Sequence, residues 1–259
     1  MENVARAAEG SDQTLNNLLL GDCFELLPNI PDKSIDLIFS DMPYNMTARN
    51  SWDGEVDLQR LWPEYERIIK DSGVIALWAQ SPFDKILACS NLKLYRYEWI
   101  IKKTSATGFL NAKKMPLKAH ENILIFYKKL PTYNPQKTSG HPRKVSTAAH
   151  KRNCKMSTDY NEHELTSYDS TERYPIDVLE FKWDKQKSAL HPTQKPVAAC
   201  EYIIKTYTNP GGLVLDSFMG AGTTGVAAQN LGRNFVGMEN DEHMFKVAEQ
   251  RIFENGNHS

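Results

Sequence analysis

The sequence predicts an α/β protein with a mostly parallel sheet. Short apolar runs of strand length alternate along the chain with longer segments whose apolar residues recur at helical spacing. A glycine-rich turn near the C-terminus follows one apolar run and opens a helical segment. Strands that alternate with helices are typical of parallel sheets, in which a helix connects each strand to the next. The chain has 259 residues, 41% of them hydrophobic, which is enough for a sizeable core.

Four strands and two helices are expected before residue 131. Residues 1–13 are polar, show no periodicity and are expected to be flexible. The predicted strands are Ser34–Ser40, Val74–Trp78, Tyr95–Ile101 and Ile123–Tyr127. The predicted helices are Leu58–Lys70, with a stop signal at Asp71–Gly73, and Ser81–Asn91, with a proline at its start.

The pattern breaks down in residues 131–187, which are rich in Pro, Ser, Thr, Asn, Lys and His and show no clean period. An irregular stretch of that length is usually functional or disordered. Regular structure is expected again after it. The predicted elements are the helices Pro196–Tyr207, Thr223–Leu231 and Glu242–Phe253, and the strands Leu213–Leu215 and Phe235–Met238.

The net charge of -1 conceals a strong asymmetry. Residues 102–155 contain 13 Lys/Arg and one acidic residue, Glu121, so this stretch carries +12 and the remainder -13. Aromatic residues lie within it, among them Phe109 and Tyr133. Basic residues interleaved with aromatic ones suit a polyanion that has flat faces to stack on, although a charge run can also be plain solvated surface.

Several classes of protein are disfavoured by composition. No apolar stretch approaches the roughly 20 residues needed to cross a bilayer, and the N-terminus does not resemble a signal peptide, so we expect a cytoplasmic protein. The four cysteines are widely spaced, with no Cys-x-x-Cys and no Cys/His cluster at zinc-finger spacing. Neither a disulfide framework nor a metal site is therefore indicated.

The glycine-rich turn, Gly220–Gly225, has the placement of a cofactor loop. Glycines between a strand and a helix let backbone N–H groups approach a ligand closely. Glu239 follows 19 residues after Gly220, at the end of the next predicted strand, where a carboxylate can bind ribose hydroxyls. The loop alone suits either NAD or S-adenosylmethionine. Its position near the C-terminus requires a permuted strand order, which disfavours a dehydrogenase, and the lack of Gly-Lys-Ser/Thr excludes a P-loop.

A tetrapeptide, Asp41-Met42-Pro43-Tyr44, follows the first predicted strand, at the end where open α/β sheets bind ligands. An exocyclic amine of a nucleobase is a poor nucleophile because its lone pair is delocalised into the ring. A carboxylate and a backbone carbonyl that accept its two N–H groups favour a pyramidal nitrogen, and a proline fixes the chain. Tyr44 is expected to stack on a flipped base, a contact worth about 1–3 kcal/mol. In isolation the tetrapeptide reads as a turn.

Together these residues resemble the amino-group DNA methyltransferases of the beta class, a permuted arrangement in which the catalytic motif precedes the cofactor loop. The resemblance covers most of the chain. It rests on Leu20–Cys23, Asp41–Tyr44, Thr107–Lys114 with His120-Glu121, His191–Pro196 and Phe218–Thr223.

The resemblance implies a Rossmann-like methyltransferase fold with a seven-stranded, mostly parallel sheet, S-adenosylmethionine as methyl donor, and a flipped base in double-stranded DNA. The catalytic residues it implies are Asp41, Pro43 and Tyr44. The cofactor-binding residues it implies are Asp22, Cys23, Thr193, Lys195, Asp216, Phe218, Gly220, Gly222, Thr223 and Glu239. On this basis residues 14–130 hold the catalytic part of the domain and residues 191–259 the cofactor-binding part.

The loop-rich insertion, residues 131–190, is the predicted DNA target-recognition region, because bases are read only by a segment that enters a groove. The predicted DNA-binding residues are Lys113, Lys114, Arg143, Lys144, Lys151 and Arg152. The insertion is short, which favours a short or relaxed target sequence, or help from a second subunit in a homodimer. A partner restriction endonuclease is also compatible with this interpretation.

The target base is expected to be adenine, methylated at N6, because Asp at the first motif position resembles adenine enzymes more than cytosine-N4 enzymes. Met42 departs from the usual Asp-Pro-Pro-Tyr, but this position is expected to contribute mainly its backbone carbonyl, so we expect activity to survive. The alternatives are a cytosine-N4 or RNA base methyltransferase, or a relative that binds DNA without turnover.

Overall fold

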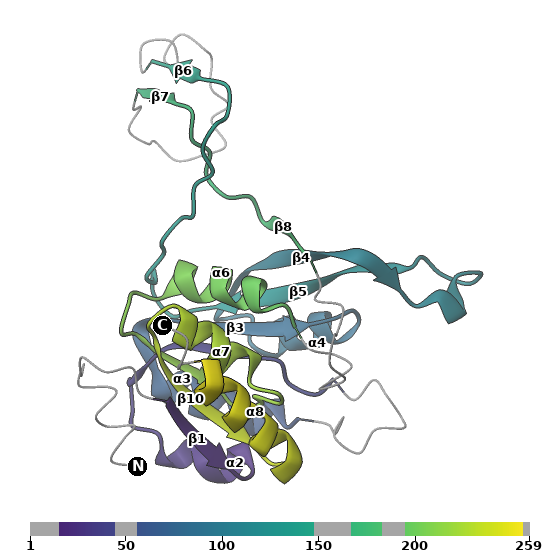
Figure 1. Ribbon diagram of the computed structural model, residues 1–259, viewed down its shortest axis with the longest axis vertical. Helices are drawn as coiled ribbons and strands as arrows, with labels where there is room; N and C mark the ends of the chain where they lie inside the picture. The colour runs from purple at the N-terminus through teal and green to yellow at the C-terminus, as the bar shows by residue number, and fades with distance from the viewer. Residues whose placement is uncertain (1–15, 45–55, 148–166, 183–194, 256–259) are drawn as a thin grey trace. The chain divides into compact units, whose positions relative to one another are not determined.

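The main sheet has eight strands, in the spatial order β1-β10-β9-β2-β3-β5-β4-β8 (Figure 1). The computed structural model describes residues 16–44, 56–147, 167–182 and 195–255. The strands of the sheet are β1 (Asn16–Leu20), β2 (Ile35–Ser40), β3 (Ile69–Ala79), β4 (Tyr95–Thr107), β5 (Lys118–Phe126), β8 (Val178–Phe181), β9 (Leu213–Asp216) and β10 (Asn234–Glu239). The α-helices are α2 (Cys23–Leu26), α3 (Leu58–Ile68), α4 (Phe83–Ser90), α6 (Val197–Tyr207), α7 (Thr223–Asn230) and α8 (Glu242–Asn255).

Of these eight strands, only β5 runs antiparallel to its neighbours. The chain passes from β2 to β3 on one side and from β9 to β10 on the other, so the connections diverge between β2 and β9. Open α/β sheets bind ligands at such a switch point, outside the carboxyl ends of the strands. The topology therefore places the expected site beyond the ends of β2 and β9.

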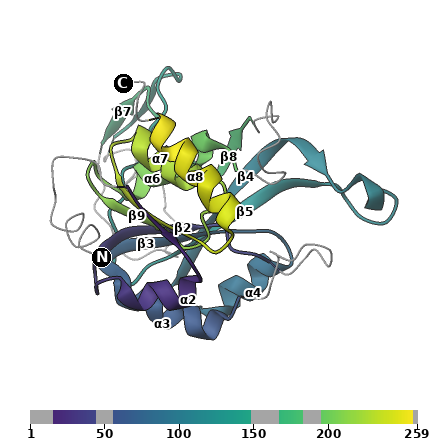
Figure 2. The same ribbon diagram turned by 60° about the horizontal axis from the view of Figure 1, so that its bottom comes forward.

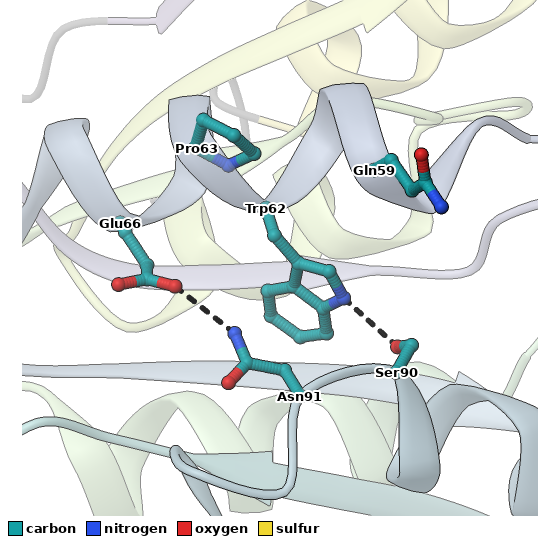
Figure 3. Close-up of a pocket in the computed structure, with 6 residues that line it drawn as sticks. All are labelled: Gln59, Trp62, Pro63, Glu66, Ser90 and Asn91. Carbon is teal, nitrogen blue, oxygen red and sulfur yellow. Dashed lines mark hydrogen bonds between the residues drawn. The ribbon is translucent and has the colours of Figure 1, made fainter.

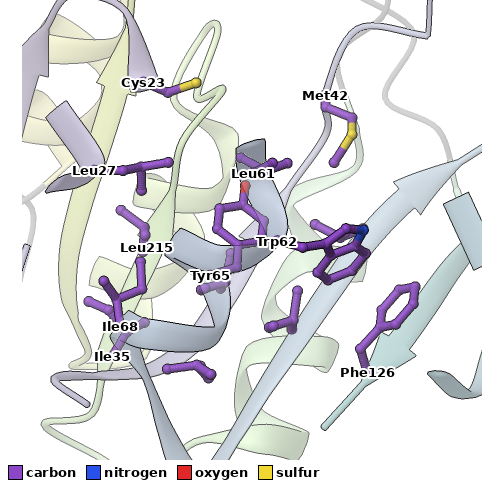
Figure 4. Close-up of a cluster of buried hydrophobic side chains, with 14 of the residues drawn as sticks. Cys23, Leu27, Ile35, Met42, Leu61, Trp62, Tyr65, Ile68, Phe126 and Leu215 are labelled. Carbon is purple, nitrogen blue, oxygen red and sulfur yellow. The ribbon is translucent and has the colours of Figure 1, made fainter. Parts of the chain in front are cut away.

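Helices cover both faces of the sheet (Figure 2). Helices α2, α3 and α4 lie on one face, where Leu61 and Tyr65 of α3 belong to the same apolar cluster as Ile35 of β2 (Figure 4). Helices α6, α7 and α8 lie on the other, where the apolar cluster includes Leu37 and Phe39. Residues 37–39 of β2 are apolar without alternation because both faces of the strand are buried there. No helix in the described ranges is long and apolar enough to cross a membrane.

The sheet has one strand more than the seven expected. The additional strand β8 lies in the stretch expected to be irregular and pairs in parallel with Ile100–Lys103 of β4. Only Leu179 and Phe181 of β8 pack against the core, which is too short a pattern to predict a strand. Strand β1 was also not predicted from the sequence, and it pairs with β10 at the other edge.

Two predicted boundaries differ from the structure. Asp71–Gly73 was expected to separate a helix from a strand, but it lies inside β3, where the pairing with β2 shifts register between Ile69 and Val74. The hairpin of β4 and β5 is longer than the apolar pattern predicted, because the outer parts of both strands are polar and exposed. Hydrophobic periodicity detects only the half of the hairpin that is buried.

Residues 135–176 form a smaller unit of their own. Within it, β6 (Lys144–Ser146) pairs antiparallel with β7 (Tyr168–Ser170). The guanidinium of Arg143 donates to both carboxylate oxygens of Asp169, at 2.8 and 2.6 Å. This bidentate pair fastens the start of β6 to β7.

The main unit holds the chain firmly on both sides of this insertion. The backbone N–H of Asn134 donates to the carbonyl of Thr206 at 2.7 Å, and its side chain donates to the carbonyl of Thr208 at 3.1 Å. On the other side, the carbonyl of Asp177 accepts the N–H of Ile100 at 2.8 Å. Both attachment points are thus fixed by hydrogen bonds within the main unit.

A groove of about 660 Å³ lies between α3 and the end of α4 (Figure 3). The indole N–H of Trp62 donates to the Ser90 hydroxyl at 2.8 Å, and the Asn91 side chain donates to Glu66 at 3.0 Å. Hydrogen bonds thus join the two helical segments across the groove. None of the lining residues belongs to the predicted site.

Replacing Gly225 with alanine should destabilise the protein. A Cβ at this position of α7 would lie 2.5 Å from Cδ1 of Ile252 and 2.7 Å from the ring of Phe235. Overpacking costs about 1–3 kcal/mol, which exceeds the roughly 1 kcal/mol that alanine gains over glycine in a helix. We expect urea denaturation to show a free energy of unfolding lower by about 1–2 kcal/mol.

The matched control is Ile252→Val, which removes the Cδ1 atom. Alone it should cost about 0.5–1.5 kcal/mol. Combined with Gly225→Ala, it should cost less than the sum of the two single changes, because one clash is gone. Strict additivity would contradict this account of the packing.

Candidate active site

The two predicted motifs meet where β2 and β9 end side by side. Strand β2 pairs in parallel with β9 through Leu37 with Val214 and Ile38 with Leu215. Two residues further along both strands, the backbone N–H of Ser217 donates to the Ser40 hydroxyl at 3.1 Å, across 177 positions of sequence. The tetrapeptide that begins at Asp41 and the loop that begins at Asp216 are therefore adjacent in space.

A buried hydroxyl cluster fixes this junction. The Ser40 and Ser217 hydroxyls lie 3.4 Å apart, and the Tyr65 hydroxyl of α3 is hydrogen-bonded to the Ser217 hydroxyl. All three side chains are fully or almost fully buried. Because buried hydroxyls are costly unless they are hydrogen-bonded, the cluster favours one arrangement of the two strand ends.

Asp41 emerges from this junction and is held from two sides. Its Oδ1 accepts a hydrogen bond from the Tyr44 hydroxyl, and its Oδ2 lies 2.6 Å from the ammonium of Lys195. The Asp41 side chain is 31% exposed, whereas that of Lys195 is only 10% exposed. The Asp41 carboxylate thus reaches solvent while its partner cation stays inside the protein.

Tyr44 and Met42 are both packed in place. The ring of Tyr44 stacks on Phe83 of α4, with ring centroids 5.1 Å apart. The side chain of Met42 is 2% exposed and packs in the cluster that includes Leu61 and Trp62 (Figure 4). The residue that replaces the usual proline therefore anchors the tetrapeptide in the core through its apolar side chain.

Lys195 continues into a chain of buried charges. Its ammonium also lies 3.1 Å from Oε2 of Glu121 in β5, and Oε1 of Glu121 lies 2.6 Å from Lys103 in β4. Gln80 donates a further hydrogen bond to Glu121 at 2.9 Å. Two carboxylates and two ammonium groups make this four-residue cluster (Asp41, Lys195, Glu121, Lys103) neutral overall.

Two members of the cluster, Lys195 and Glu121, are held in their charged forms. Burial acts to lower the pKa of Lys195, but the carboxylates of Asp41 and Glu121 outweigh it and raise this pKa above its ordinary value. Burial acts to raise the pKa of Glu121, but Lys195 and Lys103 outweigh it and lower this pKa. The ammonium beside Asp41 is therefore a permanent positive charge at physiological pH.

The glycine loop crosses from the end of β9 into α7. Gly222 has φ +75°, and a Cβ there would lie 2.9 Å from Ala248, so both conformation and packing require glycine. Gly220 has φ +48°, and a Cβ there would meet nothing within 4 Å. The backbone at Gly220 thus borders open space that a ligand could occupy, whereas Gly222 and Thr223 form the start of the helix.

Glu239 joins the loop to the end of β10. One carboxylate oxygen accepts the N–H of Gly220 at 2.8 Å and the other accepts the N–H of Asp241 at 2.9 Å. Its backbone carbonyl accepts the N–H of Gly21, immediately before Asp22 and Cys23. Three of the predicted cofactor segments therefore converge at this point, and a carboxylate beside a glycine turn fits the ribose of an adenosine cofactor.

Asp216 ends β9, and Asp22 and Cys23 follow β1, whose last residue Leu20 pairs with Glu239. Asp216 is 3% exposed, accepts the N–H of Phe218 at 3.1 Å, and has a pKa raised to about 7 by burial. Asp22 caps α2 by accepting the N–H of Phe24 at 2.8 Å. Burial raises the pKa of the Cys23 thiol to about 12, so this cysteine is an uncharged packing residue.

The remaining predicted residues lie elsewhere or outside the described part of the chain. Lys113 and Lys114 lie at the exposed end of the β4–β5 hairpin, and Arg143 and Lys144 lie in the smaller unit. Thr193, Lys151 and Arg152 lie outside the described residues. Residues 1–13, expected to be flexible, lie outside them too.

Sequence reasoning assigned no individual role to Glu121, Lys103, Gln80, Ser40 or Ser217. Glu121 carried one signal, since it is the single acidic residue in the basic stretch and directly precedes a buried apolar run. The other four carry no local pattern that distinguishes them. Their role depends on strand pairing, which hydrophobic periodicity does not reveal.

A family model described as DNA methylase matches residues 35–250, which include both motifs and the sheet that joins them. The chain belongs to the DNA methylase family. This confirms that it is a methyltransferase that uses S-adenosylmethionine and acts on DNA. The catalytic motif of the methylase precedes its cofactor loop, which is the permuted order of the beta class.

Two relatives of this methylase align over nearly its whole length. It is 29% identical to the Type II methyltransferase M.HinfI of Haemophilus influenzae, over 95% of this chain and 70% of M.HinfI. It is 27% identical to the DNA adenine methyltransferase YhdJ of Escherichia coli K12, over 91% of this chain and 82% of YhdJ.

Solved structures confirm the fold of the methylase. The complex of M1.HpyAVI with SAM matches with a TM-score of 0.62 at 22% identity, over 92% of this chain and 99% of M1.HpyAVI. The cytosine-N4-specific PvuII DNA methyltransferase matches with a TM-score of 0.65 at 16% identity, over 95% of this chain and 92% of that one. The Rossmann-like methyltransferase fold predicted from the sequence is thus confirmed, with eight strands in place of seven.

Asp216 should make the stability of the methylase depend on pH. The unfolded chain loses this proton near the ordinary carboxyl pKa of 3.8, whereas the native state holds it to about pH 7. The native state binds more protons in this window, so the free energy of unfolding should fall as pH rises from about 4 to 7 and then level off. This fall in the free energy of unfolding should be on the order of 2–4 kcal/mol in total. Urea denaturation at several pH values from 4 to 7 should show that Asp216→Asn removes it.

Asp71→Asn is the matched control. Lys129 and Lys33 lower the pKa of this exposed carboxylate to about 2, so its contribution is lost only as pH falls from about 4 through 2. Between pH 4 and 7, the free energy of unfolding of Asp71→Asn should change with pH as it does in the wild type. If Asp216→Asn also showed the wild-type dependence on pH, this would contradict a protonated Asp216.

Proposed function

We infer that this methylase is a site-specific enzyme that methylates the N6 amine of an adenine flipped out of duplex DNA. The carrying observation is the Asp41 carboxylate, held by Tyr44 and Lys195 at the switch point and adjacent to the cofactor loop. Asp at the first motif position and the similarity to the adenine methyltransferase YhdJ both favour adenine.

Asp41 accepts an N–H of the target amine and draws the nitrogen toward a pyramidal shape. A carboxylate has about four lone-pair positions, and Tyr44 and Lys195 use one on each oxygen, so acceptor capacity remains for the substrate. S-adenosylmethionine supplies a methyl group on a sulfonium, which is a good leaving group. The protein therefore needs no strong base, and its contribution is alignment and electrostatic stabilisation.

Lys195 and Glu121 act on the reaction through Asp41. Lys195 fixes the carboxylate with a short charged contact, and Glu121 holds Lys195 from the opposite side. The positive charge beside Asp41 holds its carboxylate in the orientation that points at the amine. The resemblance implies that Lys195 also lies near the methionine end of the cofactor, so one ammonium serves both halves of the site.

Tyr44 and Pro43 shape the base pocket. Phe83 already stacks on Tyr44, so the ring is held in position before a base arrives. A base that stacks on a fixed ring loses less free energy to ordering than one that stacks on a mobile ring. Pro43 restricts the backbone between the carboxylate and the ring.

The cofactor is assigned to the loop at the end of β9. Gly220 offers an open backbone surface, Gly222 and Thr223 form the N-terminus of α7, and Glu239 binds the ribose. Phe218 provides an apolar face beside them, and Asp22 with Cys23 lies near the adenine. The convergence of these segments around Glu239 supports this assignment.

Target recognition is assigned to residues 131–190, whose main part is the smaller unit, residues 135–176. Lys144 lies in its short β-ladder and supplies positive charge for DNA phosphates, whereas Arg143, predicted for the same role, is paired with Asp169. Two further predictions remain. One is that the methylase belongs to a restriction-modification system with a partner endonuclease, and the other is that it forms a homodimer.

Product analysis tests the proposed function. The purified protein is incubated with labelled S-adenosylmethionine and unmethylated duplex DNA, and the DNA is digested to nucleosides for mass spectrometry. N6-methyladenine is expected. N4-methylcytosine would keep the mechanism and overturn the base assignment, whereas no label on DNA despite cofactor binding would overturn the function.

Asp41→Asn should abolish turnover and retain the cofactor. The amide is nearly isosteric but loses the negative charge that favours the pyramidal amine, so kcat should fall by about 100-fold or more. The affinity for S-adenosylmethionine, measured by calorimetry, should stay within about threefold of the wild type, because Asp41 lies outside the glycine loop. Glu242→Gln, on the exposed surface of α8, should leave both quantities unchanged.

Lys195→Met should lower kcat more than Glu121→Gln does. The first change removes the contact to Asp41, and the second leaves that contact but loosens its support. Losses of about 100-fold and about 10-fold are expected from electrostatic groups of this kind. Thermal unfolding of both variants separates this effect from instability. If both variants are folded and lose kcat equally, the result would contradict the proposal that Glu121 acts on Asp41 only through Lys195.

A further inference from the structure

The β4–β5 hairpin ends in a compact, preformed turn. The hairpin tip, residues 108–117, contains the 3₁₀ turn η2 (Phe109–Asn111). The N–H of Asn111 donates to the carbonyl of Gly108 at 2.9 Å, and that of Lys114 donates to the carbonyl of Asn111 at 2.8 Å. Gly108 enters the turn with φ +92°, which favours glycine. These hydrogen bonds hold the tip in one conformation without any partner.

Large apolar side chains point outward from this tip. Leu110 is 101% exposed, Phe109 is 69% exposed and Met115 is 53% exposed. In both views of the fold the end of the hairpin projects beyond the helices and the rest of the main sheet (Figures 1 and 2). Single exposed apolar residues are ordinary, but three within seven positions on a projecting turn mark an interaction surface.

The tip is also basic. Residues 108–117 contain two lysines, Lys113 and Lys114, and no acidic residue. Lys113 and Lys114 are exposed, and neither forms an ion pair with any residue that the structure describes. A surface that combines free cations with exposed apolar groups fits a partner with an anionic rim and a stacked apolar interior, which is the chemistry of duplex DNA.

The base of the same hairpin forms one wall of the active site. Lys103 of β4 and Glu121 of β5 belong to the charge cluster that ends on Asp41. Phe109 lies six positions after Lys103, so the Cα atoms of these two residues are at most about 20 Å apart. A duplex that delivers a base to Asp41 therefore comes within reach of Phe109 and Leu110.

We propose that the hairpin tip enters the duplex next to the target base, with Phe109 and Leu110 as an apolar wedge and Lys113 and Lys114 on the flanking phosphates. A flipped base leaves a gap in the stack, and an apolar side chain that fills it keeps the base from returning. Because the tip is already ordered, little conformational entropy is lost on insertion. This inference rests on the proposed function.

The test compares two duplexes that carry the target sequence found by product analysis. In one, the target adenine is paired; in the other, it lies opposite an abasic position and costs little to extrude. Phe109→Ala/Leu110→Ala should lower kcat/KM on the paired duplex about tenfold or more, and on the second duplex by less than about threefold. Lys113→Ala/Lys114→Ala should weaken binding to both duplexes alike and reduce the salt slope by about 2.

The matched control is Leu92→Ala/Leu130→Ala, two leucines that are 66% and 86% exposed elsewhere on the main unit. This variant should act like the wild type on both duplexes. With 2-aminopurine at the target position, binding of the wild type should raise fluorescence, and binding of Phe109→Ala/Leu110→Ala should raise it much less.

If Phe109→Ala/Leu110→Ala lowers kcat/KM equally on the two duplexes, or on neither, the wedge is overturned. The proposed methylation activity is unaffected by that result. Loss of a dimer in Phe109→Ala/Leu110→Ala together with equal losses on both duplexes would instead assign the tip to a protein interface. If the wild type labels neither duplex, the proposed function and the wedge both fail.

Discussion

The parallel pairing of β2 with β9 is the contact on which the active site depends. Each motif belongs to a different end of the chain, and neither can form a site alone. Two register pairs and the hydrogen bond from Ser217 to the Ser40 hydroxyl bring them together. Tyr65 then ties the junction to α3, so the packing of one helical layer is coupled to the position of Asp41. The core and the site are therefore parts of the same arrangement.

The neutral charge cluster is better explained by orientation than by stability. Moving charged groups out of water costs free energy that their mutual attraction often only balances. A cluster of four such residues therefore adds little to the free energy of unfolding, and apolar residues of similar volume would stabilise the fold at least as well. Its value is geometric, since Lys195 has carboxylates on two sides and cannot move away from either one without losing an ion pair.

The architecture and the two motif positions could be predicted from the sequence, because strand and helix patterns and glycine turns are local signals. The expected strands that became β2, β9 and β10 were each correct to within one or two residues. Strand β8 and the outer half of the hairpin escaped prediction because polar, exposed strands have no apolar period. Glu121 and Lys103 escaped as site residues because their partners are distant in sequence.

The insertion after Asn134 is bonded into the main unit at each of its ends. Asn134 is bonded to the end of α6 and Asp177 is bonded to β4, independently of what lies between them. The intervening segment can therefore change in length or sequence without disturbing α6 or β4. The segment is thus replaceable as a module, because its exchange would leave the junction of β2 with β9 unchanged.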